Sequence, residues 1–184
     1  MSKHSLLILL SALSLGASIV SAGAQNAGSE AVKAIRAAYA EAKEKIKMTT
    51  GNESVPRNDV TATLRYMVPA SGERTEVFHA YFDLETDEEG AHYLPYFITR
   101  KYNVAVRNVY EEYLFDPETG LLLFVFIQSD NMEGGKDEER YYFDAMGKIV
   151  HRIVKGEDTL DADSLLMDAA RIRALIPQYL DFSY

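Results

Sequence analysis

The spacing of apolar residues changes twice along the chain, and these changes divide it into a helix, a sheet and a second helix. Apolar residues first recur every three or four positions, which is the spacing of one helix face. From Val60 onward they alternate with polar residues, as in a half-buried strand, and after Gly156 the helical spacing returns. The order predicts an α+β domain with an N-terminal amphipathic helix, a curved antiparallel meander of about seven strands, and a C-terminal helix.

The first predicted helix begins at Ser29, whose hydroxyl suits an N-cap, and ends near Met48. Its apolar face consists of Val32, Ile35, Tyr39, Ala42 and Ile46. Most charged residues, Arg36 among them, are assigned to the opposite, solvent-facing side. The apolar face must pack on another element, because an isolated helix of this length is not stable.

The strands are predicted from runs with a period of two that end at turn residues. They cover residues 60–68, 75–84, 93–102, 104–115, 121–127, 140–144 and 148–154. The acidic segment Asp83–Gly90 is predicted to turn the chain. Pro95 lacks a backbone donor, so its strand is expected to lie at an edge or to contain a bulge.

The strongest local signal is the segment from Asp116 to Gly120, which contains a proline and ends in glycine, as hairpin loops do. The segment Phe143–Lys148 has similar turn chemistry. The second helix is predicted to begin with Asp161 or Asp163 as its N-cap and to be ended by Pro177. Its buried stripe is expected to contain Leu165 or Leu166, then Ala169, Ile172 and Ile176.

The segment Leu121–Ile127 is apolar at every position, which predicts a strand buried on both faces. One helix covers only one face of a sheet. The other face requires the second helix, a curling of the sheet, or a partner, and a helix across a curved sheet often leaves a pocket. This order of elements is similar to the cystatin-like and nuclear-transport-factor-like groups, a likeness of architecture that fixes no function.

The N-terminus has the layout of a secretory signal peptide: a basic Lys3, an apolar stretch Leu6–Val20, and small residues at Ala22 and Ala24. We predict a signal peptide over residues 1–24, cleaved between Ala24 and Gln25, with cleavage after Ala22 as the alternative. The remaining residues, 25–184, form one domain. We expect an exported protein, periplasmic or secreted, with no membrane span after cleavage.

Composition restricts the partners and the chemistry. The chain has 184 residues, a net charge of -9, no cysteine and no tryptophan. Nucleic acid is not expected as a partner, because its binding requires clustered basic residues. Without cysteine, neither disulfides nor a lipid anchor at the N-terminus are available. We expect no cofactor, and the partner remains an unidentified protein or small ligand.

No catalytic or metal-binding pattern is recognisable. His79 and His151 lie in predicted strands and would hold a metal only if they met across the sheet. Glu111 and Glu112 are adjacent in a strand and must point to opposite faces, so they cannot act as a catalytic pair. The acidic loops do not match a calcium-binding template.

Aromatic and polar residues on the strands provide the remaining candidates for ligand binding. These are His79, Tyr81, Glu111, Tyr113 and Tyr141. The leading hypothesis is a non-enzymatic binding or accessory module. The alternatives are a small-ligand carrier or enzyme with a pocket between helix and curved sheet, and a protein that self-associates through an apolar sheet face.

Overall fold

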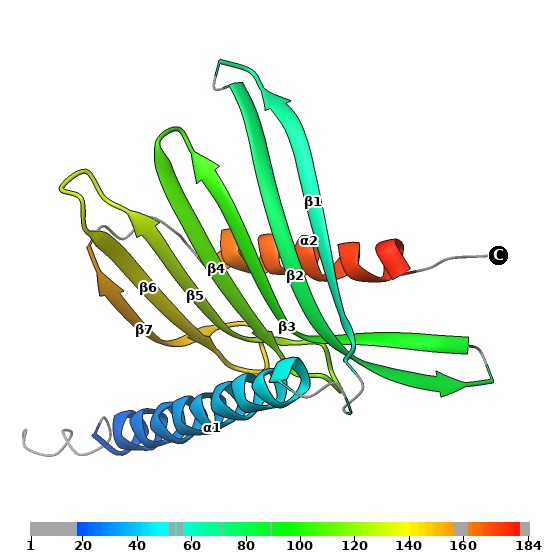
Figure 1. Ribbon diagram of the computed structural model, residues 1–184. Coiled ribbons are helices and arrows are strands. Elements are labelled where there is room, and N and C mark those ends of the chain that lie inside the picture. Colours follow the sequence, from blue (N-terminus) through cyan, green and yellow to red (C-terminus); the bar gives the residue numbers. More distant parts are fainter. Residues whose placement is uncertain are drawn as a thin grey trace, which may run out of the picture.

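The computed structural model describes residues 18–51, 54, 57–70, 72–88, 90–156 and 162–180, with side chains described from residue 28 onward except at 51 and 179. A single sheet has one helix on each side (Figure 1). The elements are α1 (Ser18–Gly51), β1 (Asp59–Val68), β2 (Gly72–Asp87), β3 (Gly90–Val104), β4 (Arg107–Phe115), β5 (Leu122–Asp130), β6 (Lys136–Phe143), β7 (Ile149–Lys155) and α2 (Ala162–Leu180).

The seven strands pair in sequence order, each antiparallel to the next, and the sheet does not close into a barrel. This confirms the predicted α+β meander between two helices. Short hairpins join the strands because each turn is built from residues that accept the required backbone angles. In the loop after β4, Gly120 has a φ of 71° and donates its N–H to the carbonyl of Asp116 at 2.8 Å.

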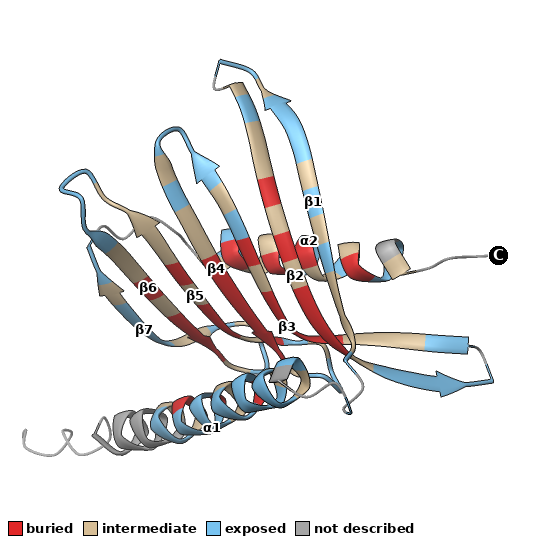
Figure 2. Ribbon diagram, in the orientation of Figure 1, coloured by how far each residue is buried: buried red, intermediate tan, exposed pale blue. Residues whose placement is uncertain are grey.

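The helix α2 packs across one face of the sheet, behind the strands in Figure 1. Its buried side chains are the predicted ones, Leu165, Ala169, Ile172 and Ile176. They meet apolar residues that alternate along the central strands, including Phe78, Ile98, Tyr113, Val125 and Tyr141. Figure 2 shows that burial is concentrated where the helices cross the strands.

The helix α1 crosses the opposite face near one end of the sheet (Figure 1). Val32, Ile35 and Ala42 of α1 pack on a row of large side chains, which are Tyr81, Phe97, Leu114, Phe124 and Tyr142. The two helices therefore cover opposite faces of the sheet, so the apolar strand β5 is covered on both sides without a partner. Both Phe124 and Val125 of β5 are buried, one on each face.

Several predicted boundaries are wrong, among them the end of β5, which runs to Asp130, and the start of β6, which begins at Lys136. The helix α1 extends N-terminally beyond Ser29, which is an interior helix residue and not an N-cap. Pro177 lies inside α2, which continues to Leu180, so this proline does not end the helix. The strand β2 continues through the acidic segment to Asp87, so the chain turns later than the composition suggests.

Pro95 occupies a central strand, where its missing N–H is accommodated by an irregular register. Residue Tyr81 pairs with Phe97, and Phe82 then pairs with Pro95, so Tyr96 is the additional residue of a bulge. The bulge alternative of the prediction is therefore confirmed.

The predicted signal peptide lies mostly outside the described residues, and the side chains of Ala22, Ala24 and Gln25 are also outside them. Within the described part of the chain, neither helix has a stretch long and apolar enough to span a membrane.

Candidate functional site

The α1 face of the sheet becomes more polar with distance from the helix. Directly beneath α1 lies the aromatic row that includes Phe97, Leu114, Phe124 and Tyr142. The next row, formed by cross-strand pairing two residues further along each strand, is Thr99, Glu112, Phe126 and Arg140. The row after that is Lys101, Tyr110, Gln128 and Glu138. A boundary between apolar and charged surface therefore runs along the edge of α1.

A pocket of about 330 Å³ lies at this boundary. Its aromatic side chains are Tyr39 of α1, Phe124 and Phe126 of β5, and Tyr142 of β6. Its charged side chains are Arg36, Glu112 and Arg140. Aromatic walls with a few placed polar groups are the usual composition of a small-ligand site.

Glu112 fixes α1 to the sheet at the base of this pocket. The carboxylate is 4% exposed and accepts hydrogen bonds from Tyr39 at 2.5 Å, Lys43 at 3.0 Å and Tyr110 at 2.6 Å. Tyr39 and Lys43 come from successive turns of α1. Burial, together with the adjacent carboxylate, raises the pKa values of Tyr39 and Tyr110, so both phenols keep their protons.

Arg36 and Arg140 approach the pocket from different elements. Arg36 donates its Nε–H to the Tyr142 hydroxyl at 3.3 Å, and its guanidinium lies 5.4 Å from the centre of that ring. Arg140 donates to Glu138 at 3.0 Å and lies 5.0 Å from the centre of the Phe126 ring. Arg36 is exposed, as predicted for the solvent-facing side of the helix, but its side chain reaches the Tyr142 hydroxyl at the rim of the pocket.

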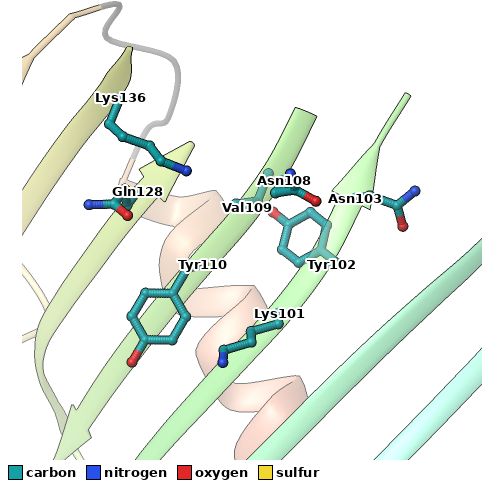
Figure 3. Close-up of a pocket in the computed structure, with 8 residues that line it drawn as sticks. All are labelled: Lys101, Tyr102, Asn103, Asn108, Val109, Tyr110, Gln128 and Lys136. Atoms are coloured by element: carbon teal, nitrogen blue, oxygen red, sulfur yellow. The ribbon is translucent and has the colours of Figure 1, made fainter. Parts of the chain in front are cut away.

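A shallower hollow of about 340 Å³ continues the same face beyond the pocket. In Figure 3, Lys101, Tyr110, Gln128 and Lys136 extend over it from four neighbouring strands, with α2 behind the sheet. Lys136 pairs with Asp130, and Asn108 donates two hydrogen bonds to the same carboxylate. Together these contacts lower the pKa of Asp130 to about 2. The hollow is polar, with Lys136 paired to Asp130 and Lys101 lying 5.7 Å from the centre of the Tyr110 ring.

The predicted ligand-binding residues do not converge on one face. His79 and Tyr81 of β2 lie on the α1 side, where the His79 ring contacts Asp59 at 2.6 Å and the Tyr81 hydroxyl at 3.2 Å. Glu111, Tyr113 and Tyr141 lie on the α2 side. As predicted, Glu111 and Glu112 occupy opposite faces of β4.

On the α2 face, Glu111 belongs to a buried ionic cluster centred on Arg100. Arg100 donates to Glu76 at 2.8 Å and to Glu111 at 3.3 Å. Hydroxyl donors complete the carboxylates: Tyr66 binds Glu76, and Tyr102 and Tyr113 bind Glu111. Because every carboxylate in the cluster has a cation and a phenol as partners, we interpret it as structural.

The cluster predicts an acid-dependent loss of stability. Burial raises the pKa of Glu76, but the Tyr66 hydroxyl and the Arg100 guanidinium outweigh it, and the net shift is below the ordinary value of 4.5. Its stabilising effect is therefore complete above pH 4.5 and is lost as the pH falls through the lowered folded pKa. Urea unfolding between pH 7 and pH 3 should show a weaker pH dependence below about 4.5 for Glu76→Gln than for the parent chain. Glu73→Gln, an exposed change on the same strand, should leave the dependence as it is.

The histidines do not form a metal site. His79 lies on β2 and His151 on the edge strand β7, so four strands separate them in the sheet. His151 instead contacts the Tyr142 ring, with centres 5.4 Å apart. Among the residues that the structure describes, no group of three or more potential metal ligands occurs.

None of the seven residues that line the pocket belongs to the predicted ligand-binding set, and Arg36, Phe126 and Arg140 were not considered for binding at all. In the sequence, Phe126 is one member of a continuous apolar run, and Arg36 is one of several charged residues on the predicted solvent-facing side of its helix. The usable signal is that Arg140 alternates with Tyr142 along β6, which places both on one face. Their approach to Arg36 depends on where α1 crosses the sheet, which periodicity does not specify.

Comparison with known proteins gives no relative: no family model, no curated protein and no solved structure matches this chain.

Proposed function

We propose that this chain is an exported binding module that holds a small aromatic carboxylate in the pocket between α1 and the sheet. The guanidinium groups of Arg36 and Arg140 receive the carboxylate, and the rings of Phe124, Phe126 and Tyr142 surround the planar part of the ligand. The export component of the proposal rests on the signal-like N-terminus, and the binding component rests on the pocket.

The observation that carries the proposal is the position of Arg36. Within the described part of the chain, no carboxylate lies within ion-pair distance of its guanidinium, although the protein carries an excess of acidic residues. Its only hydrogen bond there is to a neutral phenol, Tyr142. A guanidinium group that has no acidic partner and lies beside aromatic rings is suited to binding a ligand carboxylate, because it can donate two parallel hydrogen bonds to it.

The charge around the pocket also favours an anion. Arg36 and Arg140 line it, against the one carboxylate of Glu112. The chain as a whole has a charge of -9, so this local excess of basic groups is opposite in sign to the rest of the molecule. Such a patch raises the local concentration of anionic ligands and excludes cationic ones.

The pocket is better suited to binding than to proton transfer. Glu112 is the acid within it, and its three hydrogen bonds hold α1 in place. A general base must exchange protons with a substrate, which would break these contacts. The tyrosines next to Glu112 have raised pKa values, so they are not available as bases at neutral pH.

Binding is tested by titrating the full chain with naphthoate and following the heat released. Naphthoate is expected to bind, and naphthamide, which has the same rings without the charge, is expected to bind at least tenfold more weakly. Replacing Arg36 or Arg140 by glutamine should each weaken naphthoate binding by roughly 10- to 100-fold, the loss that accompanies removal of one charge-assisted hydrogen bond.

Arg65→Gln is the matched control, since Arg65 is exposed on β1 of the same face and does not border the pocket. This variant should bind naphthoate as the parent chain does. Equal losses in all three arginine variants would indicate a general charge effect and would exclude the pocket. Equal affinity for naphthoate and naphthamide would show that the pocket does not recognise the carboxylate, which contradicts the proposal.

A further inference from the structure

A second hollow, of about 320 Å³, lies on the opposite face of the sheet, between α2 and the strands that it crosses. Its lining is almost entirely apolar and includes Tyr93, Phe115, Leu122, Leu166, Ala170 and Ala174. The one charged side chain in the lining is Arg173 of α2. The hollow therefore differs in kind from the arginine-rich pocket under α1.

Arg173 has an unsatisfied donor in this apolar setting. Its Nε is buried and has no hydrogen-bond partner. Within the described residues, no carboxylate lies within ion-pair distance of the guanidinium, whereas its neighbour Arg171 on the same helix pairs with Asp168. A buried cationic N–H without an acceptor is costly, and such groups are rare in folded proteins.

The position of the guanidinium is fixed by the hairpin between β4 and β5. Gly120 has a positive φ of 71° and no side chain, and a Cβ at this position would overlap the guanidinium group of Arg173. The hairpin therefore leaves space that Arg173 occupies. The guanidinium of Arg173 therefore lies against this loop, at the border of the apolar hollow.

We propose that this hollow binds the carboxylate of a fatty-acid-like amphiphile, with the head group on Arg173 and the alkyl chain along the apolar lining. The proposal rests on three features that occur together: an orphaned buried donor, a single positive charge and an apolar cavity. A carboxylate supplies the missing acceptor and the opposite charge, and an alkyl chain removes the apolar lining from water. It is independent of the naphthoate pocket, from which the sheet separates it.

The size of the hollow favours a chain of medium length. It lies at the lower end of the range of small-molecule sites, which begins at about 300 Å³. Decanoate is therefore a suitable probe. Decanol has the same chain without the charge, and decylammonium has it with the opposite charge.

The test is calorimetric titration of the full chain with decanoate below its critical micelle concentration. Decanoate should bind, decanol should bind at least tenfold more weakly, and decylammonium should not bind. Arg173→Gln should weaken decanoate binding at least tenfold while leaving naphthoate binding unchanged. Arg171→Gln is the control, because it removes the same charge from a residue of α2 that does not line the hollow. It should leave decanoate binding unchanged.

A second variant tests the cavity independently of the charge. Ala170→Leu places a larger side chain in the hollow on an exposed helix position that tolerates leucine, so folding should be retained. It should abolish decanoate binding. Decanoate binding that survives either Ala170→Leu or Arg173→Gln would overturn the proposal. So would tighter binding of a short apolar peptide with a free C-terminus, which would identify a peptide site.

Discussion

Replacing Arg100 by methionine is expected to lower the free energy of unfolding by about 3–5 kcal/mol, the usual cost of removing one partner from a buried ion pair. The Arg100 side chain is 4% exposed, and those of Glu76 and Glu111 are each 3% exposed. Both carboxylates would lose the cation that they share, and they would stay buried, so water could not replace it. Arg74 would remain beside Glu76 at 3.0 Å, whereas Glu111 would retain only tyrosine hydroxyls.

Urea unfolding at pH 7 measures this loss, and its pH dependence identifies the cause. In Arg100→Met the stranded carboxylates have raised pKa values, so the difference from the parent chain should shrink as the pH is lowered and they become protonated. The triple variant that also contains Glu76→Gln and Glu111→Gln should recover part of the stability, because neutral amides still accept the tyrosine hydrogen bonds.

Arg57→Met provides the comparison with an exposed ion pair. Arg57 pairs with Asp59 at the surface, where solvent screens the pair and its contribution to stability is small. Its loss should therefore be small and should not be rescued by neutralising Asp59. If Arg100→Met costs no more than Arg57→Met, the buried cluster does not stabilise the fold, and its charges have another role.

The fold was predictable because periodicity reports which side of an element is buried. The stripe of α2 and the doubly buried strand β5 follow directly from the spacing of apolar residues. Two of the wrong boundaries lie where two rules compete. Pro177 is unfavourable in a helix interior, but it lies close to the end of α2, and the polar residues before Asp87 remain paired in a long hairpin with β3.

The pocket could not be predicted because it depends on register and on the crossing position of α1. Alternation shows that Phe126 and Gln128 share a face, but only the pairing of β5 with β6 places Arg140 next to Phe126. The same limit explains the candidate residues. His79 and Glu111 are plausible binding residues individually, yet their positions in β2 and β4 place them on opposite faces of the sheet.

Replacing Phe97 by alanine should have a comparably large effect, a loss of about 3–5 kcal/mol in the free energy of unfolding, as for other fully buried phenylalanines. Phe97 is 0% exposed and belongs to the row of large side chains beneath α1. Its ring centre is 5.9 Å from that of Tyr39 and 5.1 Å from the Lys43 ammonium group. Urea unfolding measures the loss, and Val106→Ala, at a turn position that is 89% exposed, should change stability by less than about 0.5 kcal/mol.

The two faces of the sheet make the result of Phe97→Ala specific. The cavity would form under α1, so amide hydrogen exchange should accelerate more in α1 than in α2, which packs on the other face. Tyr39 contacts Phe97 and also borders the pocket, so naphthoate binding should weaken while decanoate binding near Arg173 is retained. Equal acceleration in both helices, with both ligands lost, would mean that the sheet and its two helices respond as one unit and that the pocket has no separate dependence on α1.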